Sequence, residues 1–98
     1  MNNIVSEIQF IPVKPSNGLI GFCSFVLYES FYCSSIAIFA RPEGGYRLVY
    51  PKKNLGEKQI DIFHPIHKEA GDKVEKSVLK KINEILYPNN DRYNNIIA

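Results

Sequence analysis

The chain has 98 residues, of which 45% are hydrophobic and 22% charged, a balance that fits one globular domain and excludes a disordered chain. The formal net charge is +2, so nucleic acid is permitted as a partner but not required by composition. No apolar run approaches the roughly 20 residues of a membrane span. The first residues lack the basic and apolar regions of a secretion signal, so we expect a cytoplasmic protein without membrane contact.

The first two thirds of the chain carry the pattern of an antiparallel sheet. Alternation of apolar and polar residues marks the first segment, and Asn17-Gly18 then supplies a turn. Two longer runs, rich in β-branched and aromatic residues, are joined by Glu29-Ser30 as a long hairpin. A polar loop is expected over residues 52–56. The predicted strands are residues 4–13, 19–28, 31–40, 46–50 and 58–63.

The last third changes to a helical period. Apolar residues recur at three- and four-residue steps from about Lys68 to Leu86, which predicts one amphipathic helix that ends before Pro88. Asp72 and Glu75 resemble a capping pair and follow Gly71, which leaves open a later start of the regular helix at Asp72. The Asn-rich residues 88–98 are expected to form a flexible tail. The sequence therefore predicts an α+β fold: one domain over residues 1–87, with a twisted antiparallel sheet of about five strands and one C-terminal helix.

The central hairpin is apolar on both faces. One helix covers one face of a sheet, so the other face needs a partner, and we expect a homodimer formed through strands. Cys23 and Cys33 lie within these two apolar runs and are interpreted as buried free thiols. Their spacing alone leaves a disulfide open.

One segment carries a specific resemblance. The string Asp61-Ile62-Phe63-His64-Pro65-Ile66 follows Pro51-Lys52-Lys53 and precedes a helix with Val78-Leu79 near its middle. The order of elements and this string, over about residues 4–86, resemble the SpoVG family, the stage V sporulation or septation protein G group. The resemblance implies a twisted antiparallel sheet with a C-terminal helix, dimerised through strands. It also implies a regulator, linked to sporulation and septation, that binds DNA and in some members RNA. No catalytic activity is attributed to the family, so we expect neither an enzyme nor a cofactor.

The chain departs from the family pattern at the start of the helix. Family members commonly carry an arginine there, a candidate nucleic-acid contact, whereas this chain has Gly71, with Glu69 close by. The family's Ser-Lys-Arg group is replaced by Lys52-Lys53-Asn54. The resemblance thus implies the same fold with altered or weaker nucleic-acid binding.

Lysines supply the predicted phosphate contacts. A lysine ammonium is a flexible point charge that suits phosphate and reads base edges poorly, so binding should depend strongly on salt and weakly on sequence. The competing interpretation is a solvated helix face held by the pairs Glu69–Lys73 and Asp72–Lys76. The predicted nucleic-acid contacts are Lys52, Lys53, Lys58, Lys73 and Lys76.

Three further patterns leave alternatives open. Asp61 and His64 could form an acid–base pair and His64 with His67 a metal site, but a strand would place Asp61 and His64 on opposite sides. The structural interpretation is that His64 bonds to backbone at a corner stiffened by Pro65. Tyr46 and Tyr50 flank Arg47 and could stack bases, although cross-strand packing is the more common role. The alternative function is a dimeric regulatory adaptor that acts through a protein partner.

Overall fold

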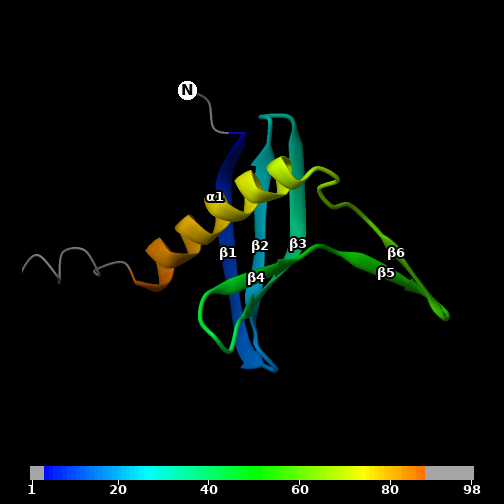
Figure 1. Ribbon diagram of the computed structural model, residues 1–98, viewed down its shortest axis with the longest axis horizontal. Helices are drawn as coiled ribbons and strands as arrows, with labels where there is room; N and C mark the ends of the chain where they lie inside the picture. Colours follow the sequence, from blue (N-terminus) through cyan, green and yellow to red (C-terminus); the bar gives the residue numbers. More distant parts are fainter. Residues whose placement is uncertain (1–3, 88–98) are drawn as a thin grey trace, which may run out of the picture.

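A computed structural model describes residues 4–87 and has the predicted α+β architecture. Four antiparallel strands form the main sheet in the order β1-β2-β3-β4, and two more form a separate small sheet. Helix α1 lies across one face of the main sheet, while the small sheet extends away to one side (Figure 1). The predicted tail, residues 88–98, lies outside the described residues. The elements are β1 (Val5–Ser16), β2 (Leu19–Leu27), β3 (Phe31–Ala40), β4 (Tyr46–Val49), β5 (Lys52–Leu55), β6 (Lys58–Asp61) and α1 (Lys68–Leu86).

The core lies between the main sheet and α1. The predicted helical stripe is confirmed, because Val74, Val78 and Ile82 are the buried residues of α1. Each fully buried aliphatic or aromatic side chain contributes about 1.5–3 kcal/mol to folding. The sheet contributes Val5, Cys23, Phe25, Cys33, Ile36 and Ile38 to this core.

Both cysteines are buried free thiols, as predicted. Cys23 comes from β2 and Cys33 from β3, in the core beneath α1. Burial raises the pKa of the Cys23 thiol to about 12. A thiol that stays protonated is a poor nucleophile, so Cys23 acts here as a small apolar core residue.

The face of the main sheet opposite α1 carries an apolar row. Cys23 is buried beneath α1, so its neighbour Phe22 points to the opposite face. Within the described residues no helix covers that face. The cross-strand register aligns Ile11, Phe22, Ala37 and Val49 across all four strands.

The small sheet corrects one prediction. Residues 52–56 were expected to be a polar loop, but Lys52–Leu55 is strand β5, paired antiparallel with β6. Gly56 follows β5 with a φ of +63°, a conformation that favours glycine in a two-residue hairpin turn. We call residues 52–61 the β5–β6 arm. All eight of its strand residues are exposed.

Candidate nucleic-acid interface

Lys52 lies on the polar face of the β5–β6 arm. The register sets it opposite Asp61, and its Nζ donates to Asp61 Oδ1 over 2.5 Å. The Lys52 ammonium lowers the pKa of the Asp61 carboxyl, with a smaller contribution from His64. Because this lysine already has a counter-charge, a phosphate contact at Lys52 would have to compete with Asp61.

The other two predicted arm lysines lie on the opposite face. Lys53 pairs with Ile60 and Lys58 with Leu55, so this face combines two ammonium groups with two aliphatic side chains. Among residues 4–87, no carboxylate lies within 4 Å of either lysine. Lys53 and Lys58 are therefore the arm cations available to a phosphate.

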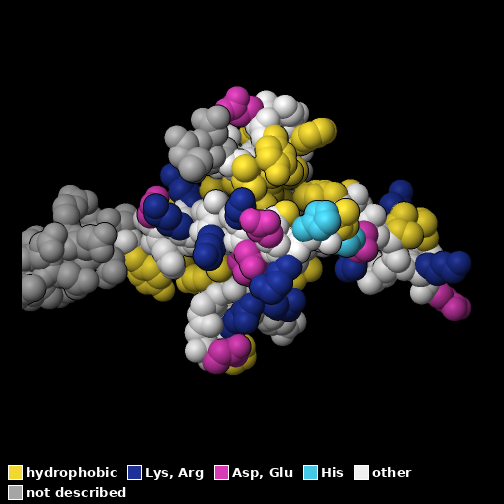
Figure 2. All heavy atoms as spheres, turned by 45° about the horizontal axis from the view of Figure 1, so that its top comes forward, with side chains coloured by type: hydrophobic (Ala, Val, Ile, Leu, Met, Phe, Trp, Pro, Cys, Tyr) yellow, Lys and Arg dark blue, Asp and Glu magenta, His cyan; other side chains and the backbone are white. Residues whose placement is uncertain are grey.

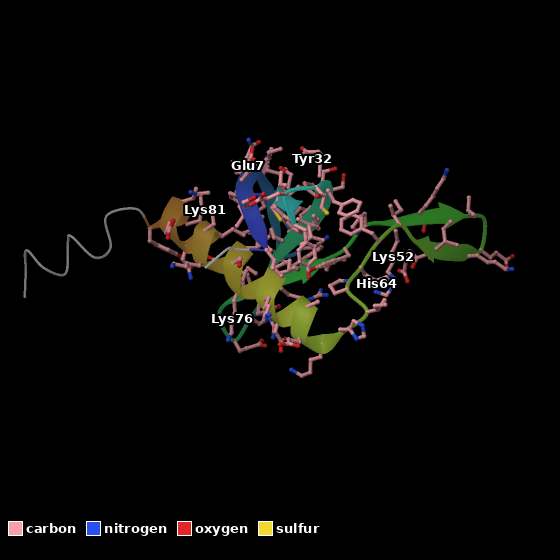
Figure 3. All side chains as sticks on the ribbon, turned by 90° about the horizontal axis from the view of Figure 1, so that it is seen from above. Glu7, Tyr32, Lys52, His64, Lys76 and Lys81 are labelled. Atoms are coloured by element: carbon pink, nitrogen blue, oxygen red, sulfur yellow. The ribbon has the colours of Figure 1, made fainter. Side chains whose placement is uncertain are left out.

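The predicted helix lysines differ from each other. Lys73 Nζ lies 3.8 Å from Glu69 Oε2, which confirms the first expected pair. The expected Asp72–Lys76 pair is wrong. Lys68, one turn earlier in α1, forms the ion pair instead, with its Nζ 2.9 Å from Asp72 Oδ2. Lys76 consequently has no carboxylate within 4 Å in the described part of the chain. Seen from above, Lys76 and Lys81 project to different sides of α1 (Figure 3).

Asp61, His64 and Pro65 form the corner between the arm and the helix. His64 Nε2 lies 3.2 Å from Asp61 Oδ2, so the expectation that these residues face opposite sides is wrong. The reason is that β6 ends at Asp61, after which the chain turns back. His64 Nδ1 lies 3.1 Å from the carbonyl oxygen of Pro65, which confirms the predicted backbone contact. The corner thus links arm and helix through one carboxylate and one imidazole.

Arg41 was not predicted as a nucleic-acid contact, and Arg47 was considered only with Tyr46 and Tyr50, in the base-stacking alternative. Arg47 lies opposite Phe39 in the β3–β4 register, and its Cζ is 5.3 Å from the centroid of the Phe39 ring. Tyr50 instead packs edge-on against Phe63, with ring centroids 5.9 Å apart. The aromatic partner of Arg47 is therefore Phe39, not its sequence neighbours. Both arginines line a hollow of about 440 Å³ at the end of the main sheet.

An apolar pocket of about 420 Å³ lies where the β2–β3 turn meets the start of α1. Phe31 and Tyr32 at its rim are 62% and 72% exposed, which is unusual for aromatic side chains. Figure 2 shows hydrophobic side chains gathered on this side of the molecule, next to the histidines. The pocket is lined by Ile4, Phe25, Leu27, Tyr28, Phe31, Tyr32, Cys33, Tyr50, Phe63, His64, Pro65, Ala70 and Val74.

The described residues carry no metal-binding constellation. No group of three or more His, Cys, Asp or Glu side chains within residues 4–87 is arranged to hold an ion. Over the same residues, no helix is both long enough and apolar enough to cross a membrane. The chemistry that remains at this surface is cationic and aromatic.

Comparison with known protein families identifies the family of this chain. The family model described as SpoVG matches residues 3–84. A search of curated proteins returns no match. The matched span contains both the arm and most of α1.

Proposed function

The chain belongs to the SpoVG family, and from this premise we propose that it is a sporulation- or septation-related regulator that acts by binding DNA or RNA. The observation that carries the proposal is the set of unpaired lysines. Of the five predicted contacts, Lys53, Lys58 and Lys76 have no carboxylate within 4 Å among the described residues. Such cations release phosphate counterions on binding, which is the main source of sequence-independent affinity.

The experiment is fluorescence anisotropy of labelled single- and double-stranded DNA and RNA at several salt concentrations. Binding should weaken steeply with salt, because each phosphate contact contributes about 0.7–0.9 to the slope of log K against log [salt]. The variant K53A/K58A, which removes two such contacts, should lower that slope by about 1.4 to 1.8. The matched control is Lys52→Ala, where a smaller change is expected because Asp61 already neutralises that lysine. A flat salt dependence for the parent protein would reject the phosphate-contact proposal.

We also propose a homodimer formed through the β5–β6 arm. An isolated two-stranded hairpin is marginally stable in water, and this one carries Leu55 and Ile60 on a single exposed face. The apolar pocket supplies a surface of matching chemistry at the start of α1. A two-fold arrangement would place the Leu55 and Ile60 side chains of each arm on the partner's pocket, while the longer Lys53 and Lys58 side chains of the same face extend past the pocket and keep their ammonium groups in solvent.

The pocket also favours a second candidate function, the regulatory adaptor with a protein partner. Exposed aromatic side chains around an apolar pocket are the usual anchors of a protein interface. The discriminating result is nucleic-acid binding at low salt by a folded dimer. If such a dimer binds none of the four polymers, the adaptor becomes the better explanation.

A further inference from the structure

The two arginines of the described residues lie in the same hollow, although neither belongs to the lysine surface. This hollow lies where the β1–β2 turn meets the β3–β4 turn, and its volume is about 440 Å³. The Arg47 guanidinium lies over the ring of Phe39, while Arg41, Glu43 and Asn17 also line the hollow. The hollow is thus lined by guanidinium groups, an aromatic ring, a carboxylate and a side-chain amide.

Backbone hydrogen bonds hold the frame of the hollow. The Ala40 amide donates to the carbonyl of Gly18 over 2.7 Å, which ties the β1–β2 turn to the end of β3. The Arg41 amide donates to the carbonyl of Gly45 over 2.9 Å and closes the β3–β4 turn. Arg47 is fixed opposite Phe39 by the strand register. The polar groups are therefore carried by a preformed scaffold, which lowers the entropic cost of binding.

The charged groups of the hollow form no ion pair among the described residues. Within residues 4–87, no carboxylate lies within 4 Å of Arg41 or Arg47, and Glu43 has no cation within that distance. Two guanidinium groups and one carboxylate thus retain their hydrogen-bonding capacity. Arginine, unlike lysine, offers a planar fork of donors that can read a base edge.

We propose that this hollow binds a guanine base unstacked from single-stranded nucleic acid, an inference that rests on the proposed function. Guanine presents the acceptors O6 and N7 on one edge, which match an arginine fork. Its Watson–Crick edge also presents the donors N1–H and N2–H, which match the carboxylate of Glu43. Adenine lacks O6, and pyrimidines lack N7. The Phe39 ring supports one face of the Arg47 guanidinium by a cation–π contact, which leaves the N–H edge of Arg47 as the fork for O6 and N7.

The β3–β4 turn and Lys76 lie on the same side of the molecule in the view from above (Figure 3). Figure 1 shows that turn below α1. A single strand that contacts Lys76 through phosphate can pass toward this turn. Lysines would then provide general affinity, while the hollow would select one base.

The first test compares oligouridine 12-mers with and without one central guanosine by fluorescence anisotropy. The guanosine should raise affinity about tenfold or more, since a bidentate arginine–guanine pair is worth that much discrimination. Substituting 7-deazaguanosine removes N7, and inosine removes the N2 amino group, so each should lose much of the gain. Arg47→Lys keeps the charge and should abolish the preference, whereas Lys53→Ala should weaken both oligomers equally. Equal affinity of the parent protein for both oligomers would overturn the proposal.

A second measurement does not depend on oligomer binding. The chain contains only three arginines, Arg41, Arg47 and Arg92, so their side-chain Nε–H signals can be resolved by NMR. Guanosine monophosphate should shift the signals of Arg41 and Arg47, and uridine monophosphate should leave them unchanged. Shifts from guanosine monophosphate without binding of any oligomer would reject the proposed function and retain the hollow as a guanine site. Identical responses to both nucleotides would reject guanine selection even if oligomers bind.

Discussion

The body of the molecule, β1–β4 with α1, buries apolar side chains, whereas the β5–β6 arm leaves its apolar side chains exposed. The body encloses nine apolar side chains, among which Ile36, Ile38, Val78 and Ile82 are 0% exposed. The arm buries none of its strand residues, and its aliphatic residues Leu55 and Ile60 remain 50% and 46% exposed. The body therefore has an apolar core that stabilises its fold, whereas the arm holds apolar surface that no part of residues 4–87 covers.

The largest expected effect is in the body. Ile82→Ala should reduce the free energy of unfolding by about 2–5 kcal/mol, because it removes buried methyl groups and leaves a cavity. The matched change in the arm, Ile60→Ala, should cost under about 1 kcal/mol at protein concentrations where the chain is monomeric. Urea unfolding followed by circular dichroism measures both. Comparable losses at the two sites would mean that the arm is part of the cooperative unit.

The second prediction concerns the proposed dimer interface at the apolar face of the arm. The variant L55D/I60D places two charges on its apolar face and should raise the dimer dissociation constant at least tenfold, since a buried interface rejects unpaired charge. The control N54D/Q59E adds two charges of the same sign to the polar face, where Asn54 and Gln59 pair. Sedimentation velocity over a concentration series separates the two. Equal behaviour of both variants would remove the arm from the dimer interface.

The same contrast explains what the sequence could predict. The end of α1 at Leu86 and the bounds of β3 at Phe31 and Ala40 follow from sequence, because a helical apolar period and a long apolar run persist over many residues. The start of α1 does not, since Asp72 with Glu75 and Gly71 favoured a later start than Lys68. Strand β5 was missed because Lys-Lys-Asn-Leu has no alternation, and it is a strand only through its pairing with β6. A segment that forms a strand only by pairing with its neighbour has little hydrophobic pattern of its own from which a strand could be predicted.

For the candidate site too, the sequence predicted residue types but not the contacts between them. The lysines could be identified from charge alone, but which of them are neutralised depends on the three-dimensional pairs, as the capture of Asp72 by Lys68 illustrates. The hollow was missed for a different reason. Phe39 and Arg47 are eight residues apart, and only the β3–β4 register makes them neighbours. The types of residue in the site could thus be predicted, but the residues that each one contacts could not.

A smaller effect is expected where the arm joins the body. Gly71 lies in the first turns of α1, and a methyl group added there would meet the Pro65 Cβ at 3.5 Å, an ordinary contact. Gly71→Ala should therefore stabilise the protein by about 0.5–1 kcal/mol, because alanine loses less backbone freedom in a helix. Thermal unfolding should show a rise in Tm of a few degrees. Gly44→Ala is the control, since a φ of +109° strains alanine and should lower Tm. A fall in Tm for Gly71→Ala would indicate that the junction with Pro65 is tighter than the contact distance implies.

The smallest expected effect is the pH response of the arm. Lys52 lowers the pKa of Asp61, so the ionised carboxylate stabilises the folded arm above the ordinary aspartate pKa of about 4. This contribution is lost as the pH falls from that value through the lowered pKa, because protonation removes the charge that Lys52 and His64 share. The amide chemical shifts of Lys52 and Asp61, followed by NMR from pH 6 to pH 2, should therefore change in this window, and the change at Lys52 should be much smaller in Asp61→Asn. The body contributes buried apolar side chains and not this ion pair, so its amides should respond later or not at all. Simultaneous changes in arm and body would show that the corner at His64 and Pro65 transmits the loss, and the two regions would then be one unit in acid.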